Sequence, residues 1–428
     1  MLNAKYEHKE GRMSAIRLIS ALLDRLPLDL VDEEVQLMFL PLVLQLVNDD
    51  SEECRESVSE CLKRLICRVS GSVAVSLYDY VLRWHEGGNG ALRRASLQLF
   101  GIFAEGRKDI LTQNGGTSRM LGCLQSSLES ADADWEVHYF ALVSLEKVMR
   151  LSPSKFTDQN GLWSAVLLEL SHDHLWVKMI SSRIVGKQLQ KHDPIDISRN
   201  ETEISFVTGR KGSLYDLASN FCGHLDEEES NMSTELSELA IKSLTWLARA
   251  MHSNPGLCYA TGEAEGKEPV KWLLTRLSNV ARRKGTLRRK AIFKCFAAIC
   301  HGGGAEMISP YLDVVIEPLH RAIIEAAGAK NHLGTEKFSS ESELAKEVLS
   351  MLEERCDADY LPALAKVKVK FRERRDQRKD DMAAERIADP ATAAKKKIEK
   401  QIAEKERRKR RVEGHRSGRG ATAKRQHV

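Results

Sequence analysis

The sequence lacks the local signatures of common catalytic and nucleotide-binding sites. Its one run of glycines, Gly302-Gly303-Gly304, is not followed by the Lys and Ser or Thr that a phosphate-binding loop requires, and it reads as a turn that ends a helix. No strand–turn–helix elbow is present to expose a nucleophilic serine. We therefore predict that the chain is not an enzyme, needs no cofactor and has no small-molecule substrate.

Paired metal-binding cysteines are also missing, although the chain holds nine cysteines. None forms a CxxC pair, and the nearest cluster, Cys295, Cys300 and His301, lacks the second pair of ligands that a structural zinc site needs. Several cysteines fall on apolar faces of predicted helices, which is typical of reduced thiols that serve as small core residues. His172-Asp173-His174 has metal-ligand residue types, but its place between two helices favours capping and turn roles. The sequence thus predicts no metal site.

Long apolar runs are absent as well. The longest, residues 35–47, is interrupted by Gln36, Pro41 and Gln45 and is too short to cross a bilayer. The N-terminus is polar and charged and has no signal-peptide pattern. We expect a soluble intracellular protein without a membrane partner.

Helical periodicity is what the sequence has in abundance. Hydrophobic residues make up 42% of the chain, whereas glycine and proline together number only 37. This composition suits helices joined by short connections, and strand-like alternation is scarce. The apolar spacing predicts helices over 5–25, 32–47, 51–69, 72–85, 90–105, 115–129, 134–151, 160–171, 174–191, 213–224, 232–251, 268–283, 286–301, 310–327, 341–356 and 359–381.

One segment indicates how these helices pair. Residues 40–65 read as an apolar helix containing Pro41, a turn at residues 48–51, and a second helix that opens with acidic residues, which favour a helix N-terminus. This segment resembles the HEAT repeat. The resemblance implies that Arg55 reaches back to the turn aspartate of the preceding repeat. We predict an all-α fold, an α-solenoid of HEAT-like hairpins over residues 1–365.

The first predicted helix pair has the pattern of an interior repeat. Leu2, Tyr6 and Ile16 begin an apolar helical spacing at once, without the capping segment that a terminal repeat normally needs. We expect that the chain is the C-terminal portion of a longer protein or packs against a partner.

Charge divides the chain into two parts. Residues 366–428 hold 23 Lys and Arg against 10 Asp and Glu, a net of +13, whereas residues 1–365 hold 42 against 51, a net of −9. We therefore predict a basic C-terminal tail over 366–428, partly helical or disordered. Because no apolar face accompanies these charges, a polyanion is a better partner for the tail than a membrane surface.

Two blocks of cations in the tail contain no acidic residue. They favour contacts to RNA phosphates without reading of base sequence, and they would equally serve as nuclear localisation signals. A solvated charged helix without a binding role is the alternative for this segment. The candidate residues are those of the two blocks and one pair near the C-terminus: Lys395, Lys396, Lys397, Arg407, Arg408, Lys409, Arg410, Arg411, Lys424 and Arg425.

The chain resembles the C-terminal region of the Down-regulated-in-metastasis family, the HEAT-repeat component twenty of the small-subunit processome. The most recognisable stretch is residues 389–397, followed by residues 423–426. At residues 418–421 the sequence departs from the family pattern, in which an aromatic residue is usual. Further matching stretches are Tyr6-Glu7-His8 with Gly11-Arg12, residues 41–54, Trp176-Val177 with Gly186, Trp272-Leu273 with Leu277-Ser278, Ile292-Phe293-Lys294, and Tyr311-Leu312 with Ile316 and Pro318-Leu319.

This resemblance implies a scaffold that acts in the nucleolus. It would support processing of the 18S ribosomal RNA precursor and assembly of the small ribosomal subunit. Its expected partners are the precursor rRNA, the small nucleolar ribonucleoprotein of the processome and other assembly factors. A generic HEAT-repeat adaptor, such as a transport receptor or phosphatase scaffold with a nuclear localisation tail, is the alternative.

Overall fold

The computed structural model describes most of the chain as helix. The described residues are 6–87, 89–112, 115–130, 133–151, 160–197, 204–226, 231–258, 266, 268–282, 286–329, 335–391, 394–395, 397–399, 401–402, 405–406 and 408–409. They contain no strand. The chain divides into two compact units, Met1–Asp357 and Ala358–Val428.

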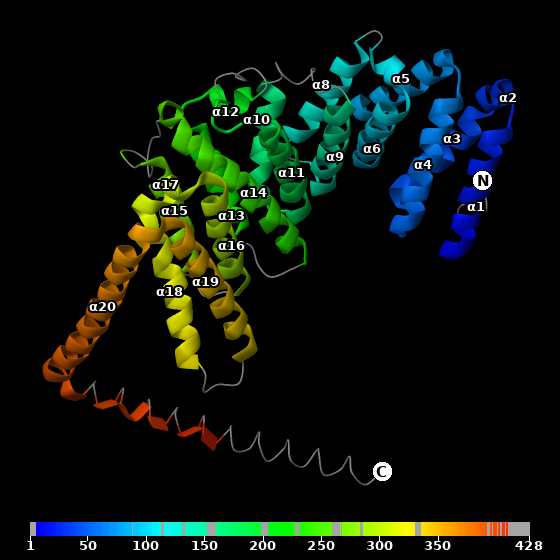
Figure 1. Ribbon diagram of the computed structural model, residues 1–428. Coiled ribbons are helices and arrows are strands. Elements are labelled where there is room, and N and C mark those ends of the chain that lie inside the picture. The colour runs from blue at the N-terminus through cyan, green and yellow to red at the C-terminus, as the bar shows by residue number, and fades with distance from the viewer. Residues whose placement is uncertain are drawn as a thin grey trace. The chain divides into compact units, whose positions relative to one another are not determined.

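The first unit consists of helical hairpins in succession (Figure 1). In each hairpin the first helix packs on the second. The pairs are α3 (Val35–Asn48) with α4 (Glu52–Arg68), α5 (Gly71–Gly87) with α6 (Gly90–Gly106), α8 (Gly116–Leu128) with α9 (Trp135–Leu151), α10 (Asn160–Leu168) with α11 (Leu175–Gln190), α13 (Ser213–His224) with α14 (Asn231–Ser253), α15 (Pro269–Ala281) with α16 (Thr286–Gly303), and α18 (Leu312–Ala329) with α19 (Thr335–Cys356).

The second helices of the hairpins form one continuous layer. Consecutive helices pack on each other along the series α4, α6, α9, α11, α14, α16 and α19. Helix α1 (Lys9–Arg25) extends this layer by packing on α4. The first helices build the other layer through contacts such as α5 with α8 and α15 with α18. This stacking of neighbour on neighbour is the architecture of a solenoid. The predicted all-α solenoid of HEAT-like hairpins is confirmed.

Helix α4 shows why these sequences fold as they do. The hydroxyl of Ser51 caps the helix by accepting a hydrogen bond from the backbone N–H of Cys54 at 3.4 Å. Val58, Leu62 and Leu65 recur at helical spacing and are fully buried between the layers. Burial of each such side chain stabilises the fold by about 1.5–3 kcal/mol.

Short helices are the elements that periodicity did not predict. They are α2 (Leu28–Glu33), α7 (Lys108–Thr112), α12 (Ser205–Thr208) and α17 (Ala305–Ile308). Each has six residues or fewer, too few to repeat an apolar spacing. Most long helices agree with the prediction to within a few residues, and the largest differences are at the start of α19 and the end of α20 (Tyr360–Ala388).

The contact between an arginine and a turn aspartate differs from the one that the HEAT resemblance implied for Arg55. Arg55 donates to the backbone carbonyl of Asp49 at 2.7 Å, within its own turn. Arg12 of α1 instead reaches forward, with Nε and Nη2 at 3.0 and 2.9 Å from the two carboxylate oxygens of Asp49. The Arg55 guanidinium is held by the carbonyl of its own turn, whereas the packing of α1 directly against α4 places Arg12 beside Asp49.

The second unit begins with one long helix, α20 (Tyr360–Ala388). The predicted boundary after residue 365 falls inside this helix and stays a prediction. Cations predominate over residues 366–379 of α20, where Glu373 and Asp376 are the two acidic residues, and Lys379 pairs with Asp376 at 2.8 Å. None of the described helices combines the length and apolar character that a bilayer span requires.

Candidate functional site

The predicted tail residues fall partly inside the described chain. Lys395, Lys397, Arg408 and Lys409 have helical backbone and exposed side chains. The remaining six candidates, Lys396, Arg407, Arg410, Arg411, Lys424 and Arg425, lie outside the described residues. Exposure of the four described cations is what contact with a polyanion requires, because a buried cation cannot reach a phosphate.

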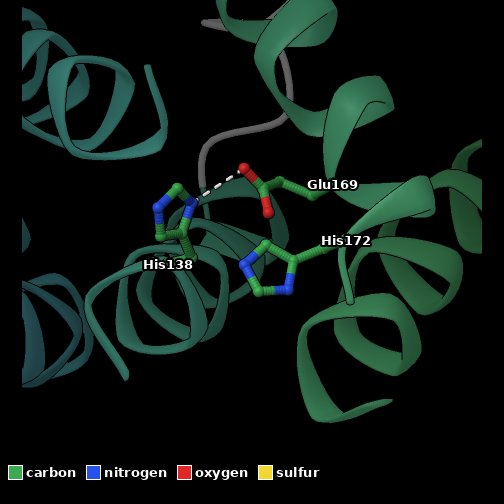
Figure 2. A group of neighbouring side chains, drawn as sticks. All are labelled: His138, Glu169 and His172. Carbon is green, nitrogen blue, oxygen red and sulfur yellow. Dashed lines mark hydrogen bonds and ion pairs between the residues drawn. The ribbon is translucent and has the colours of Figure 1, made fainter. Parts of the chain in front are cut away.

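A second group of candidate residues, with side chains of metal-ligand type, lies in the first unit, and the sequence predicted only one of its members. His138 of α9, Glu169 of the 3₁₀ turn Glu169–Ser171, and His172 place one ligand-type atom each within 4.8 Å of one another (Figure 2). His138 and Glu169 are buried, at 7% and 4% exposure. The sequence singled out His172 but missed the other two, because the fold brings α9 and this turn together across 31 residues.

Hydrogen bonds assign the protons in this cluster. His138 Nδ1 lies 2.8 Å from Glu169 Oε1, and His138 also hydrogen-bonds to the backbone of Ser130. The hydrogen bond to Glu169 raises the pKa of His138 above its ordinary value, although burial opposes this. The geometry is therefore that of an imidazolium paired with a carboxylate.

His172 has the turn role that the sequence favoured. Its Nδ1 accepts the backbone N–H of His174 at 2.9 Å, so the proton of the neutral ring sits on Nε2. Figure 2 shows the ring with its other nitrogen turned toward His138 and Glu169. Two imidazoles and a carboxylate are a usual transition-metal ligand set. A protonated Nε2 has no lone pair for a metal, and the arrangement instead directs an N–H toward Glu169, whose Oε2 has no partner among the described residues.

The ion pair between His138 and Glu169 should make stability depend on pH. Because the folded-state pKa of His138 is raised, the stabilisation is complete below the ordinary histidine pKa of about 6.5 and is lost as pH rises through the folded-state pKa. Glu169→Gln should cost about 1–3 kcal/mol at pH 6 and clearly less at pH 9. Guanidinium unfolding of both chains across this pH range measures the difference.

His85 supplies the matched control for this measurement. It is equally buried, but its ring contacts the hydroxyl of Ser127 at 2.8 Å rather than a carboxylate. Burial, and then the charge of Arg93, lower the pKa of His85, so its contribution is lost as pH falls. His85→Gln should therefore give a pH dependence of opposite sign. A constant cost of Glu169→Gln from pH 6 to 9 would refute the charged pair.

Comparison with known proteins identifies relatives over nearly the whole chain. The family model described as small subunit processome component 20 homolog, C-terminal, matches residues 93–414, and the HEAT repeat model matches residues 39–66. U3 small nucleolar RNA-associated protein 20 of Schizosaccharomyces pombe is 25% identical over 92% of this chain. The protein of the same name in Saccharomyces cerevisiae is 21% identical over 95%. The chain spans 16% of the length of each of these relatives.

Solved structures with a similar arrangement include importin beta, crystallised in an ammonium sulfate condition. It aligns over 85% of this chain and 52% of its own length, with a TM-score of 0.47 and 13% identity.

Proposed function

The chain belongs to the family of small-subunit processome component 20, C-terminal region, and from this membership we propose that it is a non-catalytic scaffold in ribosome biogenesis. In this proposal it works in the nucleolus and supports processing of the 18S rRNA precursor. Its partners are the precursor rRNA, the small nucleolar ribonucleoprotein and other assembly factors. The yeast relatives are named for association with U3 small nucleolar RNA, which supports this assignment.

The single observation that carries the proposal is the family match over residues 93–414, which includes both solenoid and tail. The solenoid has the large, layered surface that scaffold proteins use for docking partners. The tail supplies exposed cations at Lys395, Lys397, Arg408 and Lys409, which suit RNA phosphates. We assign RNA binding to the tail and protein docking to the solenoid.

Sedimentation of cell extracts tests this function. We expect the protein to migrate with pre-ribosomal particles, and its depletion to leave 18S precursors unprocessed while the large-subunit rRNA matures normally. Treatment of the extract with ribonuclease before the gradient should release the protein from these fractions. A pool that stays free, or that migrates with transport cargo, would favour the generic HEAT-repeat adaptor instead.

A further inference from the structure

A groove with a positively charged rim lies across the C-terminal halves of three helices of the second layer, α6, α9 and α11. These three helices are neighbours in the stack (Figure 1). Its volume is about 630 Å³, within the range of about 300–1,000 Å³ typical of ligand-binding clefts. Half-buried Val143 supplies aliphatic surface, and the buried Met149 and Ile184 also line the groove. The charged residues that line it are Glu105, Glu146, Lys147, Arg150, Arg183, Lys187 and Lys191.

The two carboxylates of the groove already have cationic partners. Arg183 holds Glu146 with two hydrogen bonds, at 2.9 and 2.6 Å, and Lys187 adds a third at 2.7 Å. Although burial opposes ionisation, these bonds keep the pKa of Glu146 below its ordinary value. Glu105 pairs with Arg150 at 2.7 Å and with Lys147 at 3.6 Å. Both carboxylates are therefore shared among more than one cation.

A second groove continues the first along α14. It shares Lys191 with the first groove and adds Lys242 and Arg249, with Asp193 as its carboxylate. The two grooves together are lined by seven Lys and Arg against three Asp and Glu, and Glu235 of α14 lies near enough to act on Arg183 as a fourth. This surplus of cations in the grooves contrasts with residues 1–365 as a whole, which carry a net charge of −9.

Helix ends account for part of this charge. The C-terminal end of a helix carries roughly half a negative charge, so α6, α9 and α11 together offset about one and a half cations. Arg150 and Lys187 lie in the last turns of α9 and α11 and fit that role. A surplus of cations over the four carboxylates remains after this allowance, so helix-end compensation does not account for all of it.

The uncharged lining of the grooves distinguishes between RNA and an acidic peptide as the bound polyanion. The described residues of both grooves include no Phe or Tyr, and Trp246 is buried with its Nε1 donating to the carbonyl of His192 at 2.8 Å. Base stacking on an exposed ring is therefore not available there. Aliphatic surface from Val143 and Ile241, flanked by cations, instead matches a peptide that alternates acidic and aliphatic side chains.

We propose that the groove across α6, α9, α11 and α14 binds an acidic peptide segment of a partner protein, with aliphatic side chains on its floor and carboxylates on its rim. The site is separate from the basic tail and stands whether or not the tail binds RNA. Arg150 and Lys191 are two exposed cations of the rim: the Arg150 side chain is 67% exposed, and Lys191 donates to the neutral Gln188 amide oxygen at 3.1 Å.

The test is carried out in the full chain with the ten tail candidate cations replaced by glutamine, so that the tail does not compete for acidic probes. The probe is a fluorescein-labelled 12-residue peptide of alternating glutamate and leucine, and binding is followed by anisotropy at 150 mM salt. Arg150→Glu with Lys191→Glu should weaken binding roughly tenfold or more. Lys271→Glu with Arg119→Glu is the matched control, since it makes the same charge change on exposed residues of α15 and α8.

Further measurements distinguish a peptide of acidic and aliphatic residues from other polyanions as the ligand of the groove. A 12-residue poly-aspartate peptide lacks the aliphatic anchors and should bind several-fold more weakly, and Val143→Ser should weaken the glutamate–leucine peptide but not poly-aspartate. Equal loss in the groove and control variants overturns the proposal, as does oligo(U) that binds this chain more tightly than the peptide. Thermal unfolding of each variant shows that its fold is retained.

Discussion

Replacing the eight cations of residues 395–397 and 407–411 with glutamine is expected to weaken binding of single-stranded RNA at least about a hundredfold in 50 mM salt. The four described members of these blocks, Lys395, Lys397, Arg408 and Lys409, have exposed side chains. Each phosphate contact on a single strand contributes a salt slope of about −0.7. Eight contacts give a slope of about −5.6, or a loss of roughly three orders of magnitude between 50 and 200 mM salt.

The measurement is a titration of labelled oligo(U), oligo(A) and oligo(C) at several salt concentrations. The slope should fall sharply in the glutamine variant. The three homopolymers should bind with similar affinity, because phosphate contacts carry no base information. Fluorescence imaging should also show reduced nucleolar retention of the variant.

Helix α20 provides a control with the same change in charge. It also carries eight Lys and Arg over residues 366–379, but Glu373 and Asp376 are interspersed among them, and Asp376 pairs with Lys379. The hydrogen bond from Lys379 holds the pKa of Asp376 below its ordinary value. Neutralising these eight cations should reduce the affinity far less. An equal loss in both variants would show that net charge alone, and not the two blocks, determines binding.

Replacing Arg289 with methionine is expected to lower the free energy of unfolding of the solenoid by about 3–5 kcal/mol. Arg289 is 4% exposed and joins three elements near the C-terminal end of the first unit. It donates from Nε to the carbonyl of Ala281 at 3.1 Å, and its Nη1 lies 2.6 Å from Glu325 and 3.5 Å from Glu341. Its loss leaves the buried Glu341 carboxylate without its hydrogen-bonded cation and with only the charge of Lys290 acting on it, which is costly in a low-dielectric interior.

The neighbouring Arg288 serves as the control for this variant. It also opens α16 and pairs with Asp226 at 3.0 Å, but it is more accessible to water. Arg288→Met should cost no more than about 1 kcal/mol. Guanidinium unfolding followed by tryptophan fluorescence measures both.

A second substitution, at Glu341, tests whether this carboxylate causes the loss of stability in Arg289→Met. Burial raises the pKa of the Glu341 carboxyl, so its charge is already disfavoured, although Arg289 opposes that effect. Glu341→Leu in the Arg289→Met background should therefore restore part of the lost stability. No recovery, together with equal losses for Arg288→Met and Arg289→Met, would refute a buried ionic network at this position.

Local pattern was sufficient to predict the long helices. Val58, Leu62 and Leu65 occur at helical spacing, and Ser51 caps their helix, so neighbouring residues contain the information that specifies α4. The excess of cations after residue 366 is a property of composition and needs no fold. Helices of six residues or fewer escaped prediction because they are too short to show a period.

Contacts between distant residues were beyond the reach of the sequence. The partners of Asp49, Glu169 and Glu341 lie 31 to 52 residues away, and they meet only because helices of successive repeats stack. The same stacking gathers cations of α9, α11 and α14 around one groove in a unit whose sequence is net acidic. Periodicity specifies which face of each helix is buried, whereas the packing of one hairpin on the next determines which polar side chains meet.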